Sequence, residues 1–211
     1  MWKPHFAPCV RLYSLLFLAI SLGFWLPGPV RAASVAKVGF QKMSQQSALI
    51  FEGRVIATAS RGVDTRLPFT EVTFEILDLV KGNVPGATVT LGFLGGSAVG
   101  GVLRVADMNI PPVGERGIYF VESTGQRLVH PLYGWDQGRF LVKSDPARRS
   151  ALVTNAEGAA VLTINRKARP VTTALSDGTA FGVEVTRNGE PTAAISLEQF
   201  KQEIRDAIQG H

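Results

Sequence analysis

The sequence predicts a mainly β protein, an antiparallel barrel or sandwich with a short N-terminal helix and an amphipathic C-terminal helix. Three observations lead to this fold class. Apolar and polar residues alternate over residues 49–58 and 71–76, as they do in half-buried strands. Turn-forming residues separate such segments at short intervals, which is typical of sandwiches and barrels. Residues 196–210 instead repeat their apolar positions with a helical period.

Residues 1–32 have the layout of a secretory signal peptide. A basic start precedes an apolar run over residues 12–26, and small residues follow it. We expect cleavage between Ala32 and Ala33. The apolar run is shorter than the roughly 20 residues that span a bilayer. The sequence therefore predicts a periplasmic or secreted protein with no membrane span after signal cleavage.

The composition of the remaining chain excludes several kinds of site. Without residues 1–32, 19 basic residues face 17 acidic ones, so the chain lacks the strong positive charge of a nucleic-acid-binding protein. The single cysteine, Cys9, lies in the signal region. The mature chain therefore has no disulfide and no thiol nucleophile. No pair of histidines has metal-ligand spacing, and we expect neither a metal site nor a cofactor.

The first half of the mature chain contains the clearest strand patterns. Residues 37–47 predict a short helix, and residues 48–59 predict a strand with a bulge or bend at Gly53. The strongest strand pattern begins at Phe69, where alternating apolar residues face a core. It pairs with residues 87–94 in a hairpin with a wide turn. The inward residues of the strongest strand are Val72, Phe74 and Ile76.

Later segments complete the predicted domain. Four further strands are expected, and two short segments near the end of the domain predict another hairpin. We place the β domain at 33–165, a peripheral hairpin or mobile arm at 166–195, and the C-terminal helix at 196–210, opened by a Ser196–Gln199 capping box. The four strands are expected at 101–108, 116–123, 127–134 and 138–144, and the hairpin at 151–155 with 160–164.

The glycine-rich segment 91–101 does not match the common functional motifs. It has no lysine for a P-loop, and its glycine spacing does not fit a dinucleotide-binding loop. A nucleophile elbow needs glycine where this chain has Val99. We therefore expect these glycines to supply positive φ angles in a turn or loop between strands.

The densest group of functional residue types lies in residues 130–140. Aromatic residues next to polar ones suit contacts with peptides or carbohydrates, and we expect Tyr133, Trp135 and Arg139 to form a ligand or partner contact. If residues 133 and 135 lay in one regular strand, both side chains would share a face. The alternative is that Trp135 packs in the core at the end of a hairpin.

Catalysis is the less favoured interpretation, and we assign no catalytic residue. A hydrolase would have to use His130 with a serine or an aspartate, because His211 is the last residue. Carboxylates beside turns at Asp107, Glu115 and Asp136 could come together, but such residues are ordinary at turns.

The chain contains four short motifs, "ALIFEGRVIATA", "EVTFEILDLVKG", "PVGERGIYFVES" and "GWDQGRFLV". Together they resemble a group of exported bacterial proteins of unknown function. These look like the OB-type barrel of netrin-like domains, which include tissue inhibitors of metalloproteinases. The resemblance implies an OB-like barrel, but those inhibitors use an N-terminal cysteine that this mature chain lacks, so their mechanism does not carry over.

The sequence therefore predicts an exported, non-catalytic binding or envelope-associated β domain. Its partner would be another exported protein or an envelope glycan. Two alternatives remain open, a secreted hydrolase that uses His130 and an inhibitor of a secreted protease.

Overall fold

A computed structural model describes residues 35–62, 67–98, 100–145, 150–168, 174–186 and 194–210. The predicted signal peptide and its cleavage site lie outside the described residues. Of the described helices, none is long and apolar enough to cross a membrane.

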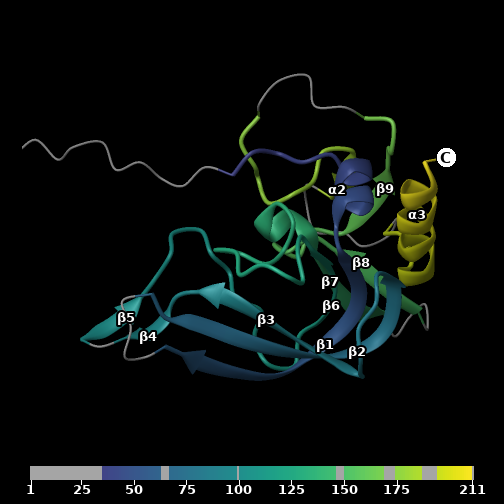
Figure 1. The fold of residues 1–211 in the computed structure, drawn as a ribbon. Coiled ribbons are helices and arrows are strands. Elements are labelled where there is room, and N and C mark those ends of the chain that lie inside the picture. The colour runs from purple at the N-terminus through teal and green to yellow at the C-terminus, as the bar shows by residue number, and fades with distance from the viewer. Residues whose placement is uncertain are drawn as a thin grey trace, which may run out of the picture. The chain divides into compact units, whose positions relative to one another are not determined.

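Antiparallel strands are the commonest regular structure of the described chain and far outnumber its helices, which confirms the mainly β fold class (Figure 1). A six-stranded sheet has the order β3-β2-β1-β6-β7-β8, and two small two-stranded sheets pair β4 with β5 and β9 with β10. The strands of the six-stranded sheet are β1 (Leu49–Arg61), β2 (Phe69–Lys81), β3 (Thr88–Leu94), β6 (Arg116–Val121), β7 (Arg139–Asp145) and β8 (Ser150–Thr154). The small sheets contain β4 (Gly96–Ala98), β5 (Gly101–Leu103), β9 (Val161–Ile164) and β10 (Val183–Val185).

Strands β1 and β2 form the long central pair that the alternating pattern predicts. Val72 and Phe74 are fully buried, and Ile76 is half-buried against the same cluster. The β1–β2 register shifts between Glu52 and Gly53, where Leu77 of β2 is skipped, so the ladder is irregular at the position where the sequence predicts a bulge or bend. A side chain at Gly53 would lie 2.6 Å from the Phe51 ring, so this bend requires glycine.

The centre of the sheet is buried on both faces. In β6, Ile118 and Phe120 belong to one hydrophobic cluster, while Tyr119 and Val121 belong to the other. The first cluster also contains residues of both helices, α2 (Phe40–Gln46) and α3 (Leu197–Gln209). A continuous apolar run is therefore the signature of this strand, since neither face meets water.

Helix α3 packs on the sheet with the stripe that the sequence predicts. The predicted capping box is present, because the Ser196 side chain accepts a hydrogen bond from the Gln199 amide and the Gln199 side chain accepts one from the Ser196 amide. Phe200 and Ile204 are fully buried. Lys201 extends from the same helix to Glu52 of β1, with 2.6 Å between its Nζ and Oε2. An amphipathic face and one buried ion pair thus hold the helix in place.

The structure corrects two of the expected strands. Of residues 101–108, only Gly101–Leu103 is a strand, paired with β4 in a small hairpin. The glycine-rich segment thus connects strands, as expected, with positive φ angles at Gly95, Gly96, Gly100 and Gly101. Residues 127–134 are irregular apart from one bridge between Leu132 and Val121, because Pro131 cannot donate to a ladder.

The late hairpin is also different from the expected one. Strand β8 joins the large sheet beside β7, whereas β9 pairs with β10, and a single bridge between Thr154 and Ala160 links β8 to the start of β9. Strand β10 lies in the segment expected to be a peripheral hairpin or mobile arm, of which residues 166–168, 174–186 and 194–195 are described.

Candidate functional site

The predicted contact residues surround a tight turn that follows the loop after β6. Trp135 starts a 3₁₀ helix, η1 (Trp135–Gly138), so it does not continue a regular strand with Tyr133. Both side chains are half-buried, and the Tyr133 hydroxyl donates to Gln46 of α2 at 2.5 Å. The two aromatic residues therefore contact the protein itself on at least one side.

Two successive left-handed residues make this turn unusual. Gly134 has φ 65°, and Trp135 has φ 62°, a conformation that costs a bulky residue about 1–2 kcal/mol. Gln137, which is 1 % exposed, holds the turn closed by donating from Nε2 to Gly134 O at 3.0 Å. Its Oε1 accepts from the Val38 amide at 2.8 Å. The strain at Trp135 is thus supported by a buried amide that also ties down the N-terminal segment.

Arg139 lies buried beneath this turn instead of on an exposed patch. Its guanidinium binds Glu115 in a bidentate pair, with 2.9 Å from Nε to Oε1 and 2.5 Å from Nη2 to Oε2. Nη1 donates to Asn109 O at 3.3 Å. The Tyr119 hydroxyl donates to Glu115 at 3.0 Å, and burial together with this carboxylate raises the pKa of Tyr119. Arg139 therefore joins the loop before β6 to β7.

His130 is buried between two aromatic rings. Its imidazole stacks on Trp135 with ring centres 5.2 Å apart and meets the edge of Phe93 at 5.0 Å. Nδ1 accepts a hydrogen bond from the Leu132 amide, so the neutral ring carries its proton on Nε2. Burial is the main cause that lowers the pKa of His130 to about 4, and the Arg139 charge adds to the effect. This histidine is a neutral packing element at neutral pH.

The expected carboxylates come together only in part. Glu115 and Asp136 both approach Arg139, and the Asp136 carboxylate also accepts a hydrogen bond from the side-chain Nδ2 of Asn109. Burial raises the pKa of Asp136. Asp107 is exposed in a turn with φ 58°. In the described part of the chain, no hydrogen bond joins His130 to a serine or an aspartate, and no three His, Cys, Asp or Glu side chains could hold a metal ion.

The same loop is attached to the edge of the large sheet. The Leu94 amide donates to Val129 O at 3.0 Å, and His130 packs on Phe93, so residues 129–130 border the end of β3. The Glu122 amide donates to Pro131 O at 2.9 Å, which closes the base of the loop. The buried residues around Trp135 therefore position the loop against β3.

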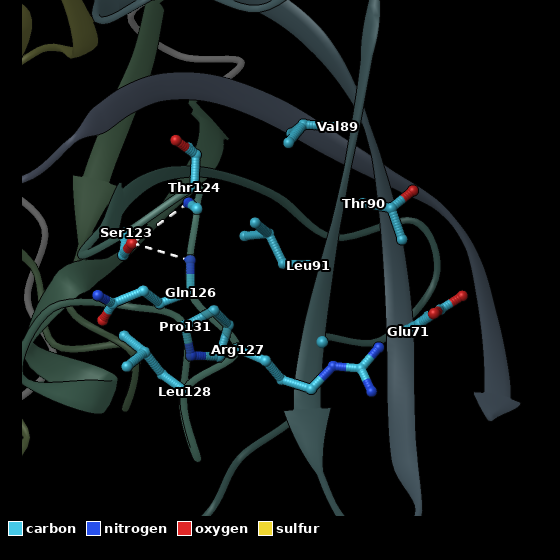
Figure 2. A pocket seen from close by; sticks show the side chains of 12 residues that line it. Glu71, Val89, Thr90, Leu91, Ser123, Thr124, Gln126, Arg127, Leu128 and Pro131 are labelled. Carbon is cyan, nitrogen blue, oxygen red and sulfur yellow. Dashed lines mark hydrogen bonds between the residues drawn. The ribbon is translucent and has the colours of Figure 1, made fainter. Parts of the chain in front are cut away.

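Between β3 and this loop the structure has an open groove, which we call the edge groove (Figure 2). It encloses about 270 Å³. Ser123 shapes the outer turn of the loop, since its hydroxyl accepts from the amides of Gly125 and Gln126 at 3.3 and 3.2 Å. The groove is lined by Glu71, Val89–Gly92, Ser123–Leu128 and Pro131.

The backbone of β3 faces this groove. The Gly95 amide donates toward β2, whereas the Leu94 amide donates toward the loop. Backbone groups alternate sides along an antiparallel strand, so those of Gly92 and Thr90 point in the same direction as those of Leu94. Within the described residues, neither has a backbone hydrogen-bond partner on that side. The edge groove therefore exposes unpaired main-chain donors and acceptors.

Arg127 marks one end of the groove. Figure 2 shows its side chain reaching from the loop across β3 toward Glu71 of β2. Its guanidinium carbon lies 4.7 Å from the centre of the Phe69 ring. Glu71 is itself bound by Arg61, with 2.9 Å between Nε and Oε2.

No protein-family model matches the chain, and neither a curated protein sequence nor a solved structure matches it. The groove residues were not found from the sequence, because an unpaired strand edge has no residue-type signature. The one available signal was the turn composition of residues 123–126 after a strong strand.

Proposed function

We propose that this protein is an exported, non-catalytic binding domain that holds an extended peptide segment of another exported protein in the edge groove. The peptide adds to β3 as a further strand. The unpaired main-chain groups of Thr90 and Gly92 carry this proposal, because they supply the hydrogen bonds that strand addition uses.

The two edges of the large sheet are treated differently, which supports a role for β3. Edge strands invite unwanted pairing, and proteins normally cover or shorten them. Strand β8, at the opposite edge, makes a bridge from Leu152 to Ser196 at the start of α3. Within the described residues, strand β3 makes a backbone contact on this edge only near Leu94, with Val129. Residues 88–92 offer an edge about 17 Å long, enough for four or five peptide residues.

The shape of the groove favours an extended chain over a compact ligand. Pockets for small molecules are mostly enclosed and hold about 300–1,000 Å³. The edge groove is smaller, lies open along a strand and presents main-chain groups on one wall. A peptide strand can use these groups whatever its side chains, whereas a glycan has no matching repeat of amide donors and acceptors.

The finer architecture and the location of the protein belong to the same proposal. An OB-like barrel of the netrin type, opened along β3, agrees with the bend that Figure 1 shows in β1 and β2 and with the register shift at Gly53. Export agrees with the layout of residues 1–32. N-terminal sequencing of protein recovered from periplasm or medium should begin at Ala33 or Ser34, and an intact N-terminus there would contradict signal cleavage.

Two variants of one residue test strand addition. A displayed library of random octapeptides is selected against residues 33–211, and enriched peptides are measured by fluorescence anisotropy. Thr90→Pro removes the outward amide proton and is tolerated best on an edge strand. Thr90→Val keeps that amide but loses the hydroxyl contact with Thr73, as proline also does. We expect Thr90→Pro to weaken binding at least tenfold and Thr90→Val to change it less than threefold.

Two results would contradict the proposal. One is that no octapeptide is enriched over a library selected against empty support. The other is that both Thr90 variants, with melting temperatures near that of the wild type, bind the enriched peptides as the wild type does.

A further inference from the structure

We infer that the edge groove selects peptides that carry a carboxylate, which Arg127 binds at the closed end of the groove. This inference rests on the proposed function, since it names the chemistry of the peptide that adds to β3. The carboxylate belongs either to a peptide C-terminus or to an aspartate or glutamate side chain.

The first observation is that Arg127 has no acidic partner in the described part of the chain. Its guanidinium is exposed and lies over the Phe69 ring. The nearest acidic residue lining the groove, Glu71, is bound to Arg61 instead. When the face of a guanidinium stacks on an aromatic ring, its N–H donors stay free at the edge of the guanidinium plane, where two of them can bind the two oxygens of a carboxylate. The groove thus presents a positive group whose charge is not neutralised locally.

The second observation is where Arg127 lies along the strand. The hydrogen bond from the Leu94 amide to Val129 O closes the groove at that end, so an added strand must stop or turn away after Gly92. Arg127 extends across β3 from the loop that makes this closure (Figure 2). A peptide that runs parallel to β3 therefore places its C-terminus near the guanidinium, and one that runs antiparallel places a side chain near its N-terminus there.

Gly92 leaves this end of the edge uncovered by a side chain. A Cβ atom there would meet only the Phe69 ring, at 3.6 Å. The hydroxyl of Thr90, two residues before Gly92, forms a hydrogen bond with the Thr73 hydroxyl of β2. Nothing on β3 itself thus supplies a charged contact. Charge recognition at the groove falls to Arg127 on the loop side.

The test uses two displayed libraries of random octapeptides, one with a free C-terminus and one embedded between constant segments. Each library is selected against the wild type, Arg127→Met and Lys143→Met. Lys143 is an exposed cation of β7, four strands away from β3, so its removal matches the change in net charge. If a side-chain carboxylate is bound, we expect wild-type selections to enrich aspartate and glutamate in the embedded library. If the terminal carboxylate is bound, we expect binders from the free-terminus library without a preference for acidic residues.

Binding of the enriched peptides should fall about tenfold in Arg127→Met and change less than twofold in Lys143→Met. Replacing the acidic residue by its amide, or amidating the terminus, should cause the same loss and shows which carboxylate is bound. The inference is overturned if the enriched peptides need the Thr90 amide but bind Arg127→Met as they bind the wild type. That outcome leaves strand addition standing, whereas a failure to enrich any peptide rejects both.

Discussion

Replacing Lys201 by methionine should destabilise the domain by about 3 kcal/mol. The ammonium lies 2.6 Å from Glu52 Oε2 and 2.8 Å from Asp78 Oδ2, and the Lys201 and Glu52 side chains are only 5 % and 3 % exposed. Removing one partner of a buried pair leaves the other charge without compensation, which costs about 3–5 kcal/mol. We expect the lower end, because Arg116 still binds Glu52 at 2.5 Å. Asp78 is 38 % exposed and regains solvent.

Urea denaturation of Lys201→Met and of a surface control measures this effect. Arg61→Met breaks the ion pair with Glu71, in which the side chains are 66 % and 27 % exposed, and should leave the free energy of unfolding nearly unchanged because solvent screens this pair. Adding Glu52→Gln to Lys201→Met should recover part of the loss, because the buried carboxylate, which then has Arg116 as its one remaining partner, is removed, while the Arg116 side chain is 35 % exposed and regains solvent. A loss below about 1 kcal/mol in Lys201→Met, similar to the surface control, would refute the reasoning that burial makes this pair important.

Three further predictions concern other parts of the fold. His130 has a pKa of about 4 in the folded protein against an ordinary 6.5, so only the unfolded chain binds a proton between these values. About 3 kcal/mol of stability, present above pH 6.5, should therefore be lost as the pH falls toward 4. Urea titrations at several pH values should show this loss, and His130→Gln should remove it. Phe74→Ala should cost about 3–5 kcal/mol in urea, because the ring is fully buried with its centre 4.6 Å from that of Tyr119; a loss below 1 kcal/mol would contradict its place in the core. Trp135→Gly should be about 1 kcal/mol more stable than Trp135→Ala, because glycine adopts φ 62° without strain, and equal melting temperatures would contradict this.

Local patterns in the sequence predicted much of the fold. Alternation identified β2 with its inward Val72 and Phe74, and the capping box identified the start of α3. Both signals come from neighbouring residues, whose effect on the backbone does not depend on the rest of the chain. Residues 127–134 were misjudged because their apolar content suggested a strand, whereas Pro131 and the His130 side chain favour a loop.

The candidate site was less predictable because it depends on contacts that are distant in sequence. The residue types suggested that Trp135 and Arg139 contact a partner. Arg139 is instead buried in an ion pair with Glu115, which comes from another loop. The edge groove has a different origin. The groove forms because the loop touches β3 at Val129 and diverges from the strand at Arg127. The sequence could not reveal it, because free main-chain groups on a strand edge leave no pattern of residue types. The alternative of a hydrolase using His130 also needed geometry, since only packing shows that this ring lies between Phe93 and Trp135.

The double-sided burial of the sheet also determines when the chain can finish folding. The first half of strand β1 must wait for β6 before its pairing on both sides is complete, and one of its faces is covered by α2 together with α3, the last helix of the described chain. Contacts between residues far apart in a sequence form slowly, because the chain loses the entropy of loop closure before these contacts contribute stability. An emerging chain that lacks α3 therefore exposes the surface around Ile50 and Phe120. Such a chain presents this apolar surface to proteases and chaperones until α3 has been synthesised and packs, so the domain is complete only after that helix is in place.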